Sequence, residues 1–285
     1  METMEIDRSG DSKVIRSHRI TGGAGCTLHV VETGNENGRP VLFVHGLSQS
    51  ALAWRKQLHS HLGNDLRMVA MDLRGHGQSD RPVDGYDDQS NWADDVHSVI
   101  TTLGLTRPIL CGWSYGGVVI GDYLRRYGDQ AIGGVCLVAA VSQLGESVMP
   151  FLGKKFVGTF PGLFSDEVEE STAAIREFIG ITTSAEPTFD DFCLTFGYVS
   201  SVPPYVRQAL LSRTLNQDGL FERLAAPVLI AHGLEDEIVL PTMSRHLATL
   251  IPHAKTSYYE GIGHATFLED PARFNSELLA FSSGL

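Results

Sequence analysis

The stretch PILCGWSYGGVVIGDYLRRY, which begins at Pro108, decides the fold of this 285-residue chain. Residues 108–113 are largely apolar, as in a buried strand, and residues 115–127 have the apolar spacing of a helix. Ser114 lies between them, with a glycine two positions before it and another two positions after it. Glycines let the strand and the helix approach each other while the serine hydroxyl projects at the edge of the sheet. This G-x-S-x-G pattern therefore predicts a nucleophilic serine.

A serine hydroxyl is a weak nucleophile at neutral pH, so it needs a base within hydrogen-bond reach. The sequence GIGH ends at His264, between the last expected strand and the last expected helix. Its glycines leave this loop free to reach across the sheet edge. We predict His264 as the base, because it follows every other member of the expected site. His45 and His232 each end a strand before a glycine and are interpreted as structural.

The base in turn needs an orienting acid. In the chain order serine, acid, histidine, this acid lies between Ser114 and His264. The sequence HGLEDEIV, residues 232–239, follows an expected strand and contains three consecutive acids. We predict Asp236 as the catalytic acid. Glu235 and Glu237 are the alternatives, interpreted as solvated or turn-forming residues.

The negative oxygen of an acyl-transfer intermediate needs two hydrogen-bond donors. One donor is expected to be the backbone N–H of Tyr115, which follows the nucleophile. The other is expected in the loop after the strand at residues 40–45, where the backbone N–H of Leu47 lies. We predict these two groups as the oxyanion hole.

Strands and helices alternate along most of the chain. Residues 40–45 are apolar at each inner position, as in a strand covered on both faces of a parallel sheet. Other strands are expected at 14–20, 27–32, 67–72, 132–141, 227–232 and 256–260, and helices at 51–62, 91–103, 242–250 and 271–281. This alternation predicts an α/β fold with helices on both faces of the sheet.

Residues 142–226 break the alternation, since they contain no run typical of a parallel strand. Nine of the thirteen phenylalanines of the chain lie here. We predict a helical cap, or lid, at 142–226 on a core domain formed by 1–141 and 227–285. The phenylalanines indicate an apolar substrate pocket, or else the filling of the cap's own core. The predicted pocket walls are Trp54, Met149, Phe151, Phe156, Phe189 and Phe196.

With these motifs the chain resembles the α/β-hydrolase fold family over about residues 27–281. The resemblance rests on HGL at 45–47, DLRGHGQSD at 72–80, GWSYGG at 112–117, GLEDEIV at 233–239 and GH at 263–264. Within the family, the chain is most similar to small serine carboxylesterases and to cofactor-free haloperoxidases, also called perhydrolases. The resemblance implies a mostly parallel eight-stranded sheet with a helical lid after strand 6. It also implies structural roles for Asp72, Arg74 and His76.

The predicted site favours an enzyme that cleaves carboxylic esters of small to medium hydrophobic substrates through an acyl-enzyme on Ser114. The same residues serve lactonases, carbon–carbon bond hydrolases and perhydrolases, and a ligand receptor without turnover also remains open. Dehalogenases and epoxide hydrolases of the family have an aspartate where this chain has Ser114. A serine attacking saturated carbon would leave a stable ether, so these two activities are not expected.

Composition sets further expectations. The formal net charge is −12, which disfavours nucleic acid and anionic lipid as partners. We expect a small-molecule ester as substrate, no nucleic-acid partner, no membrane association, and a monomer or homodimer. No metal cluster or dinucleotide fingerprint occurs in the sequence, and the predicted chemistry needs no metal and no cofactor.

The acidic N-terminus differs from a signal peptide, so a cytoplasmic location is expected. The four cysteines, Cys26, Cys111, Cys136 and Cys193, are expected to be buried free thiols.

Overall fold

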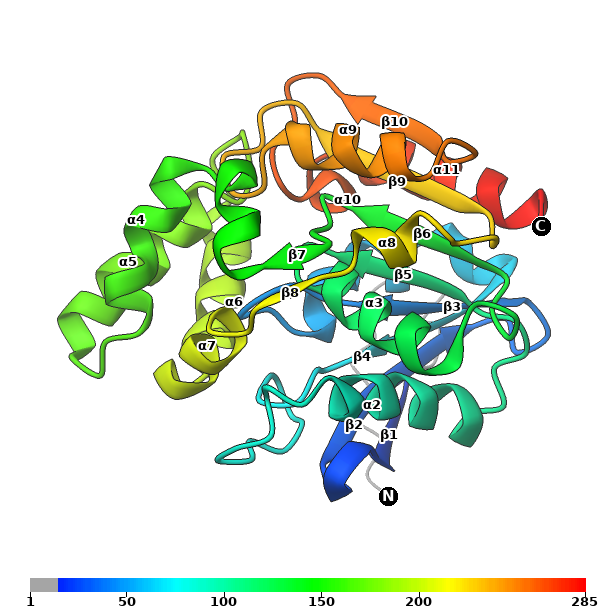
Figure 1. Ribbon diagram of the computed structural model, residues 1–285, viewed down its shortest axis with the longest axis horizontal. Helices are drawn as coiled ribbons and strands as arrows, with labels where there is room; N and C mark the ends of the chain where they lie inside the picture. The colour runs from blue at the N-terminus through cyan, green and yellow to red at the C-terminus, as the bar shows by residue number, and fades with distance from the viewer. Residues whose placement is uncertain (1–14) are drawn as a thin grey trace.

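The structure is a computed structural model that describes residues 15–285. Eight strands form one sheet in the order β1-β2-β4-β3-β5-β6-β9-β10 (Figure 1). Their bounds are Arg16–Thr21, Thr27–Gly34, Leu66–Met71, Arg39–Val44, Ile109–Trp113, Gly134–Val138, Val228–Gly233 and Lys255–Tyr259, in that spatial order. β2 runs antiparallel to β1 and to β4, and the other neighbours are parallel. The mostly parallel eight-stranded sheet is therefore confirmed.

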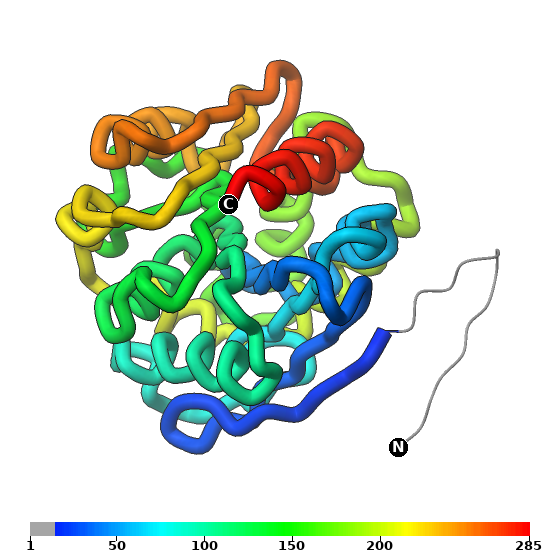
Figure 2. Tube along the Cα trace, turned by 90° about the vertical axis from the view of Figure 1, so that its right-hand side faces the viewer, coloured from blue at the N-terminus to red at the C-terminus, as the bar shows by residue number. Residues whose placement is uncertain are grey.

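The sheet separates two hydrophobic cores. In β3, Leu42 and Val44 belong to one core, and Val41 and Phe43 belong to the other, because successive side chains of a strand point to opposite faces. Helices α2 (Gln89–Thr102), α3 (Gly116–Tyr127), α8 (Asp218–Phe221) and α9 (Pro241–Leu250) cover the first face, and α1 (Arg55–Leu58), α10 (Thr266–Glu269) and α11 (Pro271–Ser283) cover the second. Figure 2 shows α11, in red, on the opposite side of the strands from α2, in blue-green. Helices on both faces are thus confirmed.

Two expected elements differ in the structure. The single helix predicted at 51–62 is three short turns, η2 (Ala51–Trp54), α1 and η3 (His61–Asn64). The last of them begins separately because the hydroxyl of Ser60 accepts the N–H of Leu62 and caps η3. The strand predicted at 132–141 is shortened to β6, because the chain turns at Ala139 with a φ of +42°. A short turn, η1 (Gly23–Gly25), joins the first two strands, and residue 14 of the first predicted strand lies outside the described residues.

The segment between β6 and β9 is mostly helical. It contains η4 (Gly145–Phe151), α4 (Lys154–Leu163), α5 (Val168–Gly180), α6 (Phe189–Ser200) and α7 (Pro204–Leu211). Two short antiparallel strands, β7 (Gln143–Leu144) and β8 (Leu215–Asn216), pair at its base. Helices α4 to α7 lie together beyond one end of the sheet (Figure 1). Phe156 packs against Phe160 and Phe178, so these three side chains fill the core of the segment itself.

The cysteines are free, but one prediction about them was wrong. Cys26, Cys111 and Cys136 are buried, whereas Cys193, in α6, is exposed. Cys111 and Cys136 are direct neighbours on the paired strands β5 and β6.

None of the helices within residues 15–285 is long and apolar enough to cross a membrane.

Candidate active site

Ser114 lies at the sharp turn between β5 and α3. Its φ of +55° is in the left-handed region, which a residue with a side chain adopts only under strain. Gly112 and Gly116 permit this turn: a Cβ at Gly112 would lie 2.6 Å from Ile120, and one at Gly116 would lie 2.4 Å from the Val44 carbonyl oxygen. The G-x-S-x-G pattern therefore forms the close strand-to-helix turn that the sequence predicted.

The loop after β3 packs directly against this serine. A Cβ at Gly46 would lie 3.0 Å from the Ser114 Cβ and 3.6 Å from its Oγ, so a side chain at that position would crowd the serine. Within residues 15–285, the backbone N–H groups of Leu47 and Tyr115 donate to no protein acceptor. Buried N–H groups are rarely left without a partner, so these two are candidates for holding a ligand oxygen.

Two buried histidines hold the loop after β3 in place. His45 accepts the N–H of Leu73 at Nε2, so its Nδ1 carries the hydrogen and donates to the Gly46 carbonyl at 2.8 Å. His76 accepts the N–H of Ser48 at Nε2 and donates from Nδ1 to a backbone carbonyl. Burial lowers the pKa of both imidazoles, that of His76 to about 3, so both stay neutral. The structural interpretation of His45 agrees with these contacts.

The neighbouring motif after β4 is also structural. The carboxylate of Asp72 accepts the N–H groups of Ala51 and Gln78, at 2.7 and 2.9 Å. The guanidinium of Arg74 forms a buried ion pair with Asp95 of α2, at 2.7 Å. These contacts fix the loop that carries His76 against the start of η2 and against α2.

Asp236 is the buried member of the three consecutive acids, while Glu235 and Glu237 are exposed. Its Oδ2 lies 2.6 Å from the Nδ1 of His264, and its Oδ1 accepts the backbone N–H groups of Ile238 and Val239. Burial by itself would raise the pKa of Asp236. The charge of His264 and the hydrogen bonds from His264 and His232 outweigh burial and lower this pKa to about 2. The carboxylate is therefore ionised at neutral pH.

The loop of His264 is joined to the strand of Ser114. The indole Nε1–H of Trp113 donates to the backbone carbonyl of His264 at 3.0 Å, and their rings lie 5.3 Å apart. The side chain of Ser114 makes no hydrogen bond to the described residues, so the contact between Ser114 and His264 remains a prediction. Catalytic hydrogen bonds are often long in unliganded enzymes.

A cavity of about 310 Å³ lies between the inserted helices and two loops of the site. Gln49 comes from the loop of Leu47, and Gly261 and Ile262 come from the loop of His264. Across from them lie Ile179, Thr182, Thr195 and Tyr198 of the inserted segment. Arg55 of the core and Asp191 of α6 also line the cavity and form an ion pair that links the two parts of the chain. Sequence patterns gave no signal for these residues, because they come from five separate segments.

None of the six predicted wall residues lines this cavity. Trp54 is fully buried in the core, stacked on Phe267 at 4.1 Å. Met149 and Phe189 are exposed on the surface, Phe151 packs against His246, and Phe156 and Phe196 pack against other phenylalanines. The phenylalanine content indicated that residues 142–226 differ from the rest of the chain, but packing within the helices decided which way each ring points.

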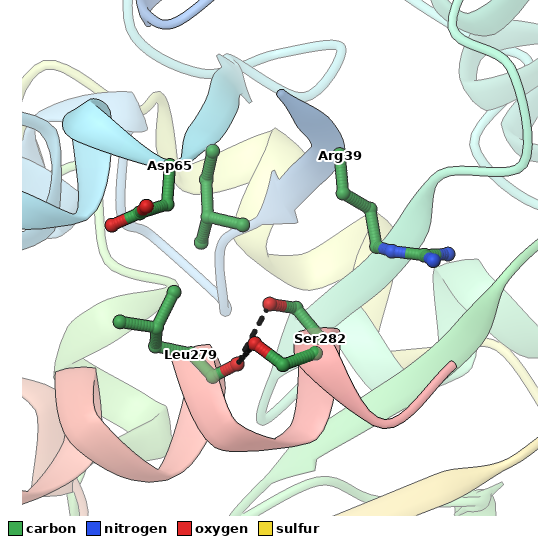
Figure 3. Close-up of a pocket in the computed structure, with 6 residues that line it drawn as sticks. Arg39, Asp65, Leu279 and Ser282 are labelled. Carbon is green, nitrogen blue, oxygen red and sulfur yellow. Dashed lines mark hydrogen bonds between the residues drawn. The ribbon is translucent and has the colours of Figure 1, made fainter. Parts of the chain in front are cut away.

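A second pocket lies away from this site (Figure 3). Arg39 begins β3 and Asp65 precedes β4, while Leu279 and Ser282 belong to α11. The pocket therefore lies at the N-terminal edge of the parallel strands. Ligands of open α/β sheets bind at the carboxyl edge, where Ser114 follows β5.

Comparisons with known proteins place the chain in a family. The sequence profile of the alpha/beta hydrolase fold matches residues 39–271. The structure of the esterase RhEst1 from Rhodococcus sp. ECU1013 superposes with a TM-score of 0.90 at 38% identity, covering 94% of this chain and 99% of that one. A non-heme chloroperoxidase of Streptomyces lividans is 29% identical, over 92% of this chain and 98% of its own. The bifunctional esterase/perhydrolase DCH of Acinetobacter calcoaceticus is 26% identical, over 92% and 98%.

The matched region spans the serine turn, the acid and the histidine, and the most similar of these proteins extend over almost the whole chain. The chain therefore belongs to the α/β-hydrolase fold family, as a hydrolase related to esterases and non-heme haloperoxidases.

Proposed function

We propose that this protein hydrolyses carboxylic esters of small to medium hydrophobic substrates, with Ser114 as nucleophile, His264 as base and Asp236 as orienting acid. The observation that carries the proposal is the 2.6 Å hydrogen bond between His264 Nδ1 and the buried carboxylate of Asp236. An ionised carboxylate accepts a hydrogen, so Nδ1 donates and Nε2 keeps a free lone pair. That lone pair is what a general base offers to the serine hydroxyl.

In the proposed reaction, the Oγ of Ser114 attacks the ester carbonyl carbon while its proton passes to His264 Nε2. The imidazolium, stabilised by Asp236, then gives this proton to the leaving alcohol, and the C–O bond of the ester breaks. Water, deprotonated by the same nitrogen, attacks the acyl-enzyme and releases the carboxylic acid. No oxidation state changes, and the proton returns to the serine.

The backbone N–H groups of Leu47 and Tyr115 are proposed as donors to the oxyanion. Neither N–H donates to an acceptor in the part of the chain that the structure describes, and both belong to segments in contact with or adjacent to Ser114. Donors of this kind typically contribute about 3 kcal/mol each to lowering the barrier. The neutral histidines His45 and His76 hold the Leu47 loop rigid, which supports a preformed hole.

The cavity beside the loops of Leu47 and His264 is proposed as the substrate pocket, with residues 142–226 as its cap. Its volume of about 310 Å³ lies at the small end of known ligand sites, which favours small to medium substrates. The pocket takes its apolar surface from Ile179, Ile262 and Leu268, and its hydroxyl groups from threonines, Ser184 and Tyr198.

Perhydrolysis is a second candidate, because relatives of the chain include a chloroperoxidase and an esterase/perhydrolase. Hydrogen peroxide would then replace water in the attack on the acyl-enzyme and yield a peracid. The same serine serves both reactions, so the acceptor decides between them.

Mass spectrometry after treatment with a fluorophosphonate tests the nucleophile, and p-nitrophenyl esters of increasing chain length test the pocket. We expect one adduct, on Ser114, absent in Ser114→Ala and retained in Ser142→Ala, a buried serine whose hydroxyl donates to Asp218 and Met243. Turnover should fall steeply for long acyl chains. An adduct on another residue, or neither adduct nor turnover in the wild-type protein, would contradict the proposal.

A further inference from the structure

The carboxylate of Asp236 contacts a second histidine besides His264. His232, fully buried near the end of β9, places its Nε2 2.9 Å from Asp236 Oδ2. This is the oxygen that lies 2.6 Å from His264 Nδ1. The other oxygen, Oδ1, accepts the N–H groups of Ile238 and Val239 at 2.8 and 3.0 Å. Both oxygens therefore have two polar partners, and the carboxylate cannot rotate without breaking contacts.

The surroundings of His232 determine where its hydrogen lies. Its Nε2 is also 2.8 Å from the backbone carbonyl of Val239. A carbonyl and a carboxylate only accept, so Nε2 carries a hydrogen, which points to the Val239 carbonyl with the Asp236 oxygen beside it at 2.9 Å. Its Nδ1 forms a hydrogen bond with the hydroxyl of Ser244, a fully buried residue of α9. The imidazole is thus fixed at both nitrogens by two different elements.

From this geometry we infer that His232 is a positioning residue, which holds the carboxylate of Asp236 in the orientation that receives His264. The inference rests on the proposed function, in which Asp236 orients the base. The contacts form one buried series from Ser244 through His232 and Asp236 to His264. Loss of the imidazole would free one carboxylate oxygen to turn away from His264 and would change the strength of the remaining hydrogen bond.

The chain offers a matched control at another buried histidine. His29 of β2 contacts the carboxylate of Asp72 through Nδ1 at 2.7 Å and the hydroxyl of Ser17 through Nε2 at 3.0 Å. It has the same kinds of partner as His232, but within residues 15–285 its carboxylate forms no hydrogen bond to a second histidine. Replacement of His29 therefore reports the cost of losing a buried histidine–carboxylate contact in general.

Steady-state kinetics on a p-nitrophenyl ester compare His232→Leu, His232→Gln, Ser244→Ala and His29→Leu. We expect His232→Leu to lower kcat by up to about 100-fold, with KM changed less than about twofold. His232→Gln keeps an N–H donor near the position of Nε2 and should restore most of kcat. His29→Leu should keep kcat even where it lowers the melting temperature. A wild-type kcat in His232→Leu, or an equal loss in His29→Leu, would overturn the inference.

Proton NMR gives a readout that needs no turnover. The hydrogen on His264 Nδ1, bonded to Asp236, should give a low-field resonance. We expect it to move further downfield in His232→Leu and by a smaller amount in Ser244→Ala. The Ser244→Ala variant keeps the imidazole, so it can be measured even where the leucine variant does not fold. The resonance should stay in place in His29→Leu. An unmoved resonance in the His232 and Ser244 variants would overturn the inference. A moved resonance in a protein that neither turns over esters nor reacts with a fluorophosphonate would instead reject the proposed function alone.

Discussion

Trp113 and His264 are joined at the carboxyl edge of the sheet, although 151 positions separate them in the chain. The indole Nε1–H donates to the backbone carbonyl of His264 at 3.0 Å. Trp113 is the last residue of β5 and directly precedes Ser114. The loop of the proposed base is therefore tied to the strand that carries the proposed nucleophile, through a contact that involves neither reactive side chain.

This tie can be tested with Trp113→Phe, which keeps an aromatic ring but removes the N–H. We expect kcat to fall roughly 10-fold, because the loop of His264 loses its anchor and the base its alignment. Trp54→Phe is the control, since the indole N–H of that buried tryptophan makes no hydrogen bond to the described residues. Ester hydrolysis and thermal melting are measured for both. Equal activity of the two variants would show that the tie does not align the base.

The assignment of the acid can be tested among the three consecutive acids. Asp236→Asn should lower kcat by about 10⁴-fold, because the amide no longer stabilises the imidazolium and favours the wrong tautomer of His264. Glu235→Gln and Glu237→Gln change exposed side chains and should leave kcat within about twofold of wild type. Steady-state kinetics decide, and a large loss in either glutamine variant would move the acid away from Asp236.

Stability at low pH should depend on the same carboxylate. The folded state lowers the pKa of Asp236 to about 2, below the ordinary value of 3.8. The unfolded state therefore binds more protons between these values, so the stabilisation is complete above about pH 4 and is lost as pH falls towards 2. This shift in pKa corresponds to about 2 kcal/mol in the free energy of unfolding. Urea unfolding of wild type, Asp236→Asn and Glu235→Gln measures it.

In those measurements, the stability difference between wild type and Asp236→Asn should shrink by about 2 kcal/mol from pH 5 to pH 2. The difference between wild type and Glu235→Gln should stay constant, because that carboxylate is exposed. Parallel pH curves for all three proteins would contradict the lowered pKa of Asp236.

The strained turn at Ser114 predicts that two inactive variants differ in stability. Ser114→Ala and Ser114→Gly should both abolish ester turnover, since each lacks the hydroxyl. The glycine variant should be more stable than the alanine variant by about 1 kcal/mol, because glycine adopts a φ of +55° without strain. Thermal unfolding of the pair tests this, and a glycine variant less stable than the alanine variant would refute it.

The inserted segment is anchored to α3 by a buried ion pair. Arg213, just before β8, lies 2.7 Å from Asp122 of α3 and donates to the hydroxyl of Tyr115. Arg213→Met should destabilise the protein by about 3–5 kcal/mol, because it leaves a buried carboxylate without its partner. Adding Asp122→Leu should recover part of this loss. The exposed pair of Lys155 and Glu237 is the control.

Chemical denaturation gives the unfolding free energies of these variants. Lys155→Met should change stability by less than about 0.5 kcal/mol, as expected for a solvent-exposed pair. If the double variant of Arg213 and Asp122 were no more stable than Arg213→Met alone, the loss would come from packing and not from the unpaired charge.

The fold could be predicted from the sequence because its signals are local. The apolar run of β3 and the glycines around Ser114 act within one element or one turn, so they can be interpreted without knowing the rest of the chain. The prediction of one helix at 51–62 was wrong for an equally local reason, because Ser60 caps a separate turn, η3, within that range.

Contacts between distant segments could not be predicted in this way. Sequence alone indicated that Trp54 was a pocket residue, whereas the packing of the second core buries it beneath Phe267. It also left His232 as a strand-end residue, although a histidine four positions before the predicted acid was a usable signal.

The sequence by itself determined the order of strands and helices, the strained turn at Ser114 and the family, since periodicity and glycine conformation depend on neighbouring residues. Only the tertiary structure decided which of three acids is buried against His264, which histidine supports that acid, and which side chains line the cavity. These three features depend on how loops from separate strands meet at the carboxyl edge of the sheet. The number of residues between two positions in the sequence does not give their distance in the folded protein.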